Sequence, residues 1–174
     1  MPFLTALAPA DRYDEQHAQR HKAVPRGAQH MILLLHRWYP DRALVIVGDQ
    51  EYAAIDLLAA TRQVATIVTR LRLDAHLCAP APPRLPHQTG RPRVVGPRLP
   101  TLAARAADPT TVWTGLTVAR WSGEDQRAIA LVSGTAVWYH GGKPPVPIRW
   151  VLIRDPRGEF PTQVLLCTDL DAIP

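Results

Sequence analysis

Residues 42–60, RALVIVGDQEYAAIDLLAA, combine an apolar run, an acidic residue and a helical pattern. The run at residues 44–47 predicts a buried strand covered on both faces of a sheet. Gly48 ends the run, and Asp49 follows at the strand end, where α/β sheets present catalytic groups and ligands. Apolar side chains then recur at the spacing of a helix, at Ala54, Leu57 and Leu58.

The carboxylate of Asp49 has two interpretations. A carboxylate held at a strand end is a suitable ligand for a hard divalent cation. The same side chain could instead cap the helix that follows, which is the more common role of such a residue. Strand–Asp–helix units also occur in phosphatases and response-regulator-like domains, so this unit alone leaves both interpretations open.

Composition favours one ordinary domain with an anionic partner. The chain has 174 residues, 47% of them hydrophobic, and a formal net charge of +5, which makes nucleic acid the first candidate partner. The two cysteines, Cys78 and Cys167, lack the spacing of a metal site and predict buried thiols in a reducing cytosol. No signal peptide and no apolar stretch of transmembrane length is found, so no membrane association is expected.

The flanking segments extend the central unit into a parallel sheet. Residues 64–69, VATIVT, predict a second strand, which makes residues 44–69 a β–α–β unit with a right-handed crossover. Pro25 suits the first turn of a helix. The helix it begins is amphipathic and should pack on the sheet, with apolar side chains at Ala28, Met31, Ile32, Leu35 and Trp38.

Residues 79–100, APAPPRLPHQTGRPRVVGPRLP, carry several prolines and no acidic residue. Such a segment cannot form a regular helix or a central strand, so an extended cationic surface loop is expected. Phosphate contact is one interpretation, because arginine offers forked donors, and a solvated linker is the other. The arginines concerned are Arg84, Arg91, Arg93 and Arg98.

From residue 111 onward the pattern is that of antiparallel strands. Strands are predicted near residues 112–118, 127–132, 135–139, 148–154 and 163–168, with turns between them. Four of the five tryptophans fall in this part, and packing within the core or on a sheet face explains most of them. An α/β front part is therefore joined to a β-rich back part.

Ten segments spread over nearly the whole chain carry a family resemblance: PFLTALAP, RYDEQ, RHK, RALVIVGDQEYAAIDLL, VTRLRLDAHLCAPAPP, GRPR, GPRLPTLA, GTAVWYH, PPVPIRWVLIRDP and VLLCTDLDA. In this order they resemble a DDE transposase of bacterial insertion sequences. The resemblance implies a partial ribonuclease-H-like core over residues 1–76, a proline- and arginine-rich linker over 77–110, and a β-rich insertion with a return strand over 111–174.

The chemistry of that family uses three carboxylates that hold two divalent cations, Mg²⁺ or Mn²⁺, for in-line attack on a phosphodiester. Asp49 matches the second carboxylate and is the expected catalytic and metal-binding residue. The first carboxylate should lie on a strand before residue 2, and the third, a glutamate, on a helix after residue 172. The sequence is therefore expected to be truncated at both ends.

Other acidic residues do not match the family's pattern. Glu51 is too close to Asp49 in sequence to converge on the same metals, and Asp169 and Asp171 precede the position of the catalytic helix. The remaining acidic candidates lie on a polar segment that does not have the pattern of a core strand; they are Asp11, Asp14 and Glu15.

Truncation would leave the strand of Asp49 with an unpaired edge and exposed apolar surface. The chain is therefore expected to be marginally stable or aggregation-prone.

Three functions remain open at this stage. The first is a transposase fragment that is inactive alone, partnered by transposon-end DNA, self-associated as a transposase dimer, and located in the bacterial cytoplasm with the nucleoid. The second is a non-catalytic DNA-binding protein or transposition regulator, and the third is an unrelated α/β phosphate-ester hydrolase. DNA contacts are expected at the four loop arginines and at Arg70 and Arg72, which follow the second strand.

Overall fold

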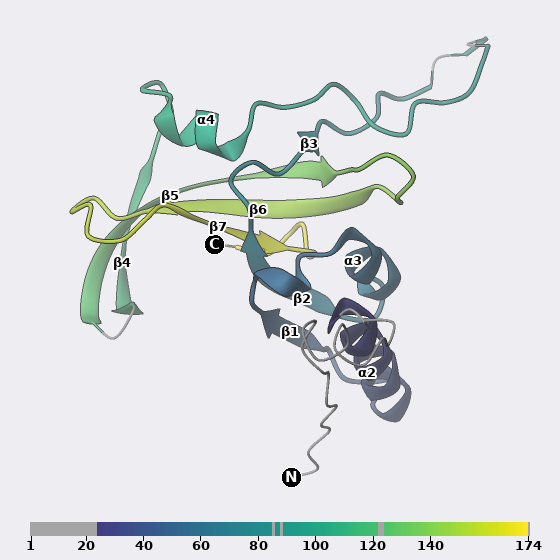
Figure 1. Ribbon diagram of the computed structural model, residues 1–174, viewed down its shortest axis with the longest axis horizontal. Helices are drawn as coiled ribbons and strands as arrows, with labels where there is room; N and C mark the ends of the chain where they lie inside the picture. Colours follow the sequence, from purple (N-terminus) through teal and green to yellow (C-terminus); the bar gives the residue numbers. More distant parts are fainter. Residues whose placement is uncertain (1–23, 85, 88, 122–123, 174) are drawn as a thin grey trace, which may run out of the picture.

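The computed structural model describes residues 24–84, 86–87, 89–121 and 124–173. The predictions for residues 3–8 and for the polar segment at residues 11–22 lie outside this part of the chain. Figure 1 shows a long sheet with helices packed along it, and a thin projection between β3 and α4. In chain order the elements are α2 (Val24–Trp38), β1 (Val45–Gly48), the 3-10 helix η1 (Gln50–Tyr52), α3 (Ile55–Thr61), β2 (Thr66–Leu71), β3 (Leu77–Cys78), α4 (Leu102–Ala107), β4 (Thr114–Trp121), β5 (Glu124–Trp138), β6 (Val146–Arg154) and β7 (Gln163–Cys167).

The described strands form one mixed sheet in the order β1-β2-β7-β6-β5-β3, with β4 paired to β5. The pair β1 and β2 is parallel, and all other pairs are antiparallel. The parallel pair is joined through α3, as the predicted β–α–β unit requires. The expected fold class is therefore confirmed: a mixed α/β structure consistent with a partial ribonuclease-H-like fold. The division of the chain at residues 76 and 110 stays a prediction.

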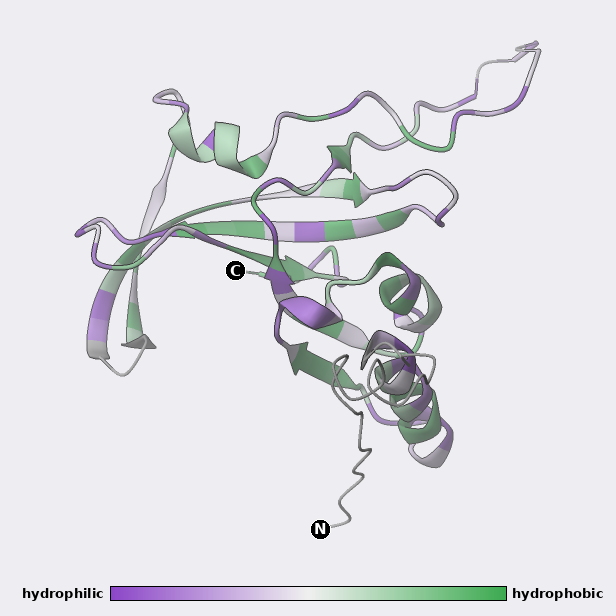
Figure 2. Ribbon diagram, viewed as in Figure 1, coloured by the Kyte–Doolittle hydropathy of each residue, from purple (hydrophilic) through white to green (hydrophobic). Residues whose placement is uncertain are grey.

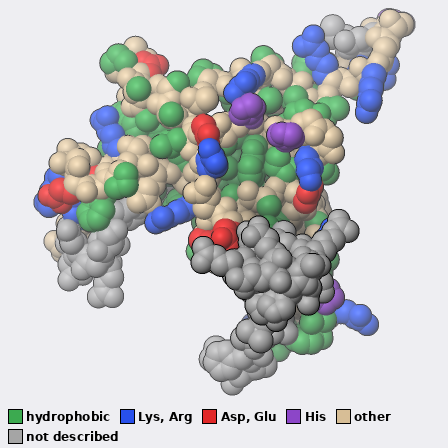
Figure 3. Space-filling view, viewed as in Figure 1, with side chains coloured by type: hydrophobic (Ala, Val, Ile, Leu, Met, Phe, Trp, Pro, Cys, Tyr) green, Lys and Arg blue, Asp and Glu red, His purple; other side chains and the backbone are tan. Residues whose placement is uncertain are grey.

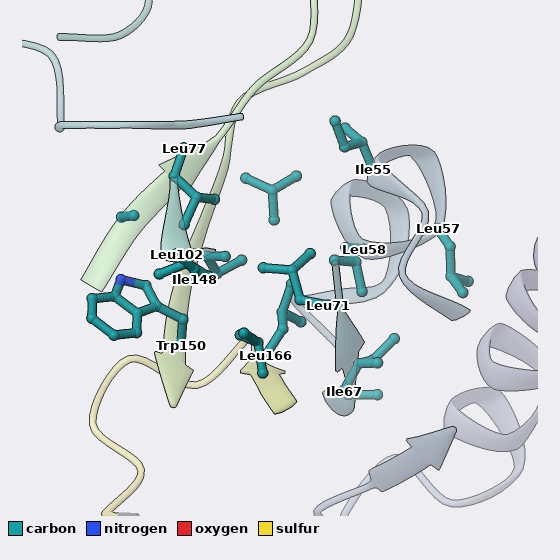
Figure 4. Close-up of a cluster of buried hydrophobic side chains, with 14 of the residues drawn as sticks. Ile55, Leu57, Leu58, Ile67, Leu71, Leu77, Leu102, Ile148, Trp150 and Leu166 are labelled. Carbon is teal, nitrogen blue, oxygen red and sulfur yellow. The ribbon is translucent and has the colours of Figure 1, made fainter. Parts of the chain in front are cut away.

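One face of the sheet carries the hydrophobic core. Along β2, β6 and β7 buried and half-buried residues largely alternate, as expected for a sheet with one well-covered face. Among the described residues, α2, α3 and α4 all contribute to one buried cluster on that face. Figure 4 shows part of this cluster. Burial of so many aliphatic side chains is the main stabilising term of the fold. Its central members are Ile55, Leu57, Leu58, Ile67, Leu71, Leu77, Leu102, Ile148, Trp150 and Leu166.

The first strand differs from its prediction. β1 lies at the edge of the described sheet and has one neighbour there, β2. Val45 is 62% exposed and Val47 is 76% exposed, while Leu44 and Ile46 pack against the core. The expectation of a strand covered on both faces is therefore wrong within the described residues. Figure 2 shows the resulting apolar strand at the margin of the sheet. Within the described residues, β1 therefore has an unpaired edge and exposed apolar surface, as predicted.

The β-rich part contains one long strand where two were predicted. β5 runs without a break through Ser133 and Gly134, which the sequence suggested as a boundary. A Cβ atom on Gly134 would lie 2.7 Å from the indole of Trp150, so this glycine makes room for a buried ring on the neighbouring strand. Trp150 is 4% exposed, which confirms its expected packing role.

The described residues of the segment 79–100, which exclude 85 and 88, form no helix and no strand, as predicted. They leave β3, project far from the sheet and return to α4 (Figure 1). Both cysteines are free thiols; Cys78 is buried and Cys167 is half-buried. Among the described residues, no helix is long and apolar enough to cross a membrane.

Candidate active site

Asp49 lies at the carboxyl end of β1, beside the end of β2. Gly48 pairs with Thr69 in the parallel ladder. The buried hydroxyl of Thr69 donates a hydrogen bond to the backbone carbonyl of Asp49, which ties the residue to the neighbouring strand. A Cβ atom on Gly48 would lie 2.6 Å from the Tyr52 ring, so the chain turns tightly here. The position of Asp49 is thus fixed by both strands.

The Asp49 carboxylate is exposed and only partly engaged. Its Oδ1 accepts a hydrogen bond of 3.1 Å from the backbone N–H of Glu51 and so caps η1. This is the capping role that the sequence left open. No other described residue is seen to bond this carboxylate, so its second oxygen remains available to a ligand.

A cleft of about 650 Å³ opens next to this strand end. Gln50 contributes to its wall, and the end of β5 with the following loop forms the opposite side. An ion pair between Asp56 and Lys143 joins the two sides. Figure 3 shows the face of the molecule with apolar surface among histidines and paired charges. The cleft also has aromatic and basic lining residues that no sequence motif indicates as functional: Trp138, Tyr139, His140 and Lys143.

Two of the predicted DNA-binding arginines lie at the same end of the sheet as Asp49. Arg70 is exposed on β2, and Arg72 follows that strand. Arg72 donates two hydrogen bonds, of 2.8 and 2.7 Å, to the carboxylate of Asp74. This bond lowers the pKa of Asp74 and raises that of Arg72, so the pair stays charged across the ordinary pH range. Asp74 therefore offsets part of the positive charge that Arg72 could present to a phosphate.

The loop arginines are not brought to Asp49. Arg84, Arg91 and Arg93 lie on the projection, and Arg98 pairs with Cys78 at its base beside β3. β3 stands at the opposite end of the sheet order from β1. Five strand spacings separate the two, or roughly 24 Å in an untwisted sheet. The six predicted arginines therefore form two separate cationic regions.

The structure places the other acidic candidates away from Asp49 or outside the described residues. β7 runs antiparallel to β2, and the N–H of Thr168 bonds to the carbonyl of Ile67. Asp169 and Asp171 therefore lie at the opposite end of β2, roughly 13 Å from the level of Asp49 along the strand. Glu51 is exposed within η1, where its backbone bonds Asp49. Asp11, Asp14 and Glu15 are not among the described residues.

The described residues do not by themselves fit a two-metal centre. Two catalytic cations about 3.5–4 Å apart need several shared carboxylate ligands. Within the described ranges, no group of three histidine, cysteine, aspartate or glutamate side chains is placed to hold a metal ion. Asp49 supplies one ligand oxygen in a suitable place, and the remaining ligands are not found around it.

Comparison with known protein families shows the family to which this chain belongs. The sequence profile of a family described as DDE superfamily endonuclease matches residues 4–145. The chain belongs to this DDE superfamily. No match was found among curated proteins or among solved structures. The resemblance stated from the sequence is thereby confirmed. Members of this superfamily generally depend on divalent metals, and their substrate is DNA.

Proposed function

We propose that this chain is part of a DDE transposase and that Asp49 is the second of its three catalytic carboxylates. The intact enzyme would cleave DNA at transposon ends and transfer the strands in a metal-dependent reaction. The observation that carries the proposal is the position of Asp49 at the end of β1, with one carboxylate oxygen unengaged, in a chain of this family. Arg70 and Arg72 lie at the same end of the sheet and would hold the DNA backbone there.

The catalytic centre of this chain would be incomplete. The first aspartate and the final glutamate would come from strands and helices outside these 174 residues. Support comes from the position of β1 at the edge of the sheet that the described residues form and from the exposure of Val45 and Val47 there, since an added strand and a covering layer would bury both. The chain alone would then be catalytically inactive and prone to aggregate.

Mg²⁺ or Mn²⁺ would bind at Asp49 only after the other carboxylates have joined it. A bound metal of this kind supplies Lewis-acid activation of water or of a DNA 3′-hydroxyl. The role of Asp49 is to supply a carboxylate oxygen as a metal ligand at a fixed position. The hydrogen bond from Thr69 and the helix cap both support this role, because they hold the residue in place. Action at two transposon ends would also involve self-association, in the bacterial cytoplasm near the nucleoid.

A plasmid-nicking assay tests the incomplete centre. It compares the 174-residue chain with a chain extended at both ends by the corresponding segments of a DDE transposase, with Mg²⁺ or Mn²⁺. We expect nicking by the extended chain alone. Metal-dependent nicking by the 174-residue chain would contradict the proposal, because the active site would then lie among residues assigned here to structure.

A second candidate function is a non-catalytic DNA-binding protein or transposition regulator. The observation that favours it is the cationic projection, which stands apart from Asp49 and needs no catalytic centre to bind DNA. Salt-dependent DNA binding by the 174-residue chain, with no nicking by the extended chain, would favour this candidate over the transposase. The other α/β hydrolase chemistry considered from the sequence has no specific support, because no second carboxylate converges on Asp49 among the described residues.

A further inference from the structure

The projection at residues 79–98 is firmly held at its base. Leu77 is 2% exposed, and its carbonyl accepts a 2.8 Å hydrogen bond from the N–H of Leu99. Ala79 exchanges backbone hydrogen bonds with the returning chain, donating to Pro97 and accepting from Gly96 at 2.9 and 2.8 Å. A Cβ atom on Gly96 would lie 2.4 Å from the carbonyl of Pro80, so the two chains approach as closely as their backbones allow. The projection at residues 79–98, called the arm below, is therefore narrow, and Leu77 at its base is buried.

Beyond its root the arm is exposed and stiffened by proline. Residues 80–84 and 89–94 are all exposed and belong to no helix or strand. Six prolines, at positions 80, 82, 83, 86, 92 and 97, fix φ and remove backbone donors along the arm. An extended chain that is already restricted loses less conformational entropy when it binds.

The charge of the arm is of one sign. No aspartate or glutamate occurs between residues 75 and 107. Among the described residues, no hydrogen bond or ion pair engages the side chains of Arg91, Arg93 or Arg98. Figure 3 shows basic side chains grouped on the arm, away from the acidic groups of the body. These guanidinium groups are therefore available to an anionic partner.

The tip has a geometry suited to a narrow groove. Gly90 has φ of +97° with open space where a Cβ would stand, and it leads into Arg91-Pro92-Arg93. Arg91 and Arg93 are both exposed, on backbone that forms no helix and no strand, and Pro92 between them favours an extended chain. The minor groove of B-DNA is about 6 Å wide, whereas the major groove is about 12 Å wide and is usually filled by a helix or a two-stranded ribbon. The described residues of the tip form neither element.

We propose that Arg91 and Arg93 enter the minor groove of A·T-rich DNA. This inference rests on the proposed function for its choice of DNA as the partner. A·T-rich segments have a narrow minor groove with enhanced negative potential that attracts inserted arginine. In G·C pairs the amino group of guanine projects from the groove floor and would exclude the side chains. The arm therefore selects for A·T-rich flanks at a distance from the carboxylate of Asp49.

The test is binding of the complete 174-residue chain to three short duplexes that differ only in their central base pairs. The centres are A·T, G·C and inosine·cytosine, and binding is measured by fluorescence anisotropy over a range of salt. Inosine·cytosine lacks the minor-groove amino group but keeps the G·C pattern of acceptors and donors in the major groove. We expect the A·T and inosine·cytosine duplexes to bind about tenfold more tightly than the G·C duplex.

Substitutions then assign the preference to the tip. The double variant Arg91→Ala/Arg93→Ala should bind the A·T duplex about tenfold more weakly, lose the preference, and reduce the salt slope by about 2. Arg91→Lys/Arg93→Lys should keep the salt slope and lose most of the preference, because ammonium groups are more strongly hydrated than guanidinium. The matched control, Arg62→Ala/Arg157→Ala, removes the same charge from exposed sites off the arm and should keep the preference.

Each other result overturns the inference in a recognisable way. If inosine·cytosine binds like G·C, or if no duplex is preferred, the arm does not read the minor groove, and DNA as partner still stands. If the Arg91→Ala/Arg93→Ala variant keeps the preference for the A·T duplex, the residues that distinguish the base pairs lie elsewhere in the chain. Absence of binding to every duplex would contradict both this inference and the choice of DNA as the partner of the chain.

Discussion

Asp49 and Asp155 occupy equivalent places in the chain, since each is the first residue after a strand. Their surroundings differ. The side chain of Asp155 is 3% exposed and accepts hydrogen bonds from the guanidinium of Arg127 and from three backbone N–H groups of the following turn. The Asp49 carboxylate is exposed and accepts one hydrogen bond among the described residues, from the backbone N–H of Glu51. The carboxylate of Asp155 is saturated by hydrogen bonds from its own fold, whereas the carboxylate of Asp49 can still accept a ligand.

This difference separates a structural carboxylate from a candidate catalytic one. The Asp155 turn is closed by a second ion pair from Arg127 to Glu159, at 2.6 Å, and by the Phe160 ring, 4.4 Å from the Arg127 guanidinium carbon. The Asp49 end of the sheet has an open edge and exposed valines instead. The antiparallel strands should therefore contribute most of the stability, and the end of the parallel pair β1 and β2 should carry the chemistry.

Removal of the Arg127 side chain should have the largest effect on stability. Arg127→Ala leaves the buried carboxylate of Asp155 without its cation, and the loss of a buried ion-pair partner costs about 3–5 kcal/mol. Urea unfolding monitored by circular dichroism measures it. Arg62→Ala, at an exposed site, should change stability by less than about 0.5 kcal/mol. A loss below about 1 kcal/mol for Arg127→Ala would show that the turn does not hold the antiparallel part together.

One substitution made on both sides of the comparison should give unequal effects. Val164 is 2% exposed in β7, and Val47 is 76% exposed in β1. Val164→Thr buries a hydroxyl in the core and should cost about 1–3 kcal/mol. Val47→Thr should be neutral within about 0.5 kcal/mol and should lower the light scattering of concentrated samples, because it reduces exposed apolar surface. Equal losses for the two variants would mean that β1 is covered in solution.

The two aspartates should also differ in their contribution to acid stability. Burial works to raise the pKa of Asp155, but hydrogen bonds from the backbone of the turn and from Arg127 outweigh it and lower the pKa to about 2. Because the folded-state pKa lies below the usual 3.8, ionised Asp155 stabilises the fold above about pH 4, and this contribution is lost as the pH falls towards 2. The urea midpoint should therefore fall over this interval.

The matched variants show which carboxylate is responsible. Asp155→Asn should have a lower midpoint at neutral pH and a weaker dependence on pH between about 4 and 2. Asp49→Asn should retain the pH dependence of the natural chain, because asparagine also serves as a helix cap and the carboxylate accepts one described hydrogen bond. An unchanged acid transition in Asp155→Asn would contradict the assignment of Asp155.

The sequence predicts the elements well where the pattern is local. The apolar run before Gly48 and the helical spacing after it predict β1 and α3, and prolines predict the irregular arm. It fails where distant residues decide. Gly134 resembles a strand boundary until Trp150 is seen beside it. Four apolar residues cannot reveal how many faces of β1 are covered, since neighbouring strands determine that.

The candidate site is predictable to a similar degree. Asp49 is found from its place after a buried run, because a strand end in an α/β sheet is a local signal. The basic and aromatic wall of the neighbouring cleft is not found, because Trp138, His140 and Lys143 come to line the same cleft as Gln50 only when distant strands fold into one sheet. The separation of Asp169 from Asp49 follows from the antiparallel register of β7, which no spacing in the sequence encodes.

The most direct test of the catalytic assignment is the single-turnover cleavage rate of a transposon-end duplex by the extended chain. Asp49→Asn keeps the helix cap and removes a charged ligand worth several kcal/mol in the transition state, so the rate should fall by about 10³-fold. Asp169→Asn, an acidic control at the opposite end of β2, should leave the rate within about twofold. If Asp49→Asn cleaves like the natural sequence, Asp49 is a helix cap alone, and the catalytic assignment is wrong.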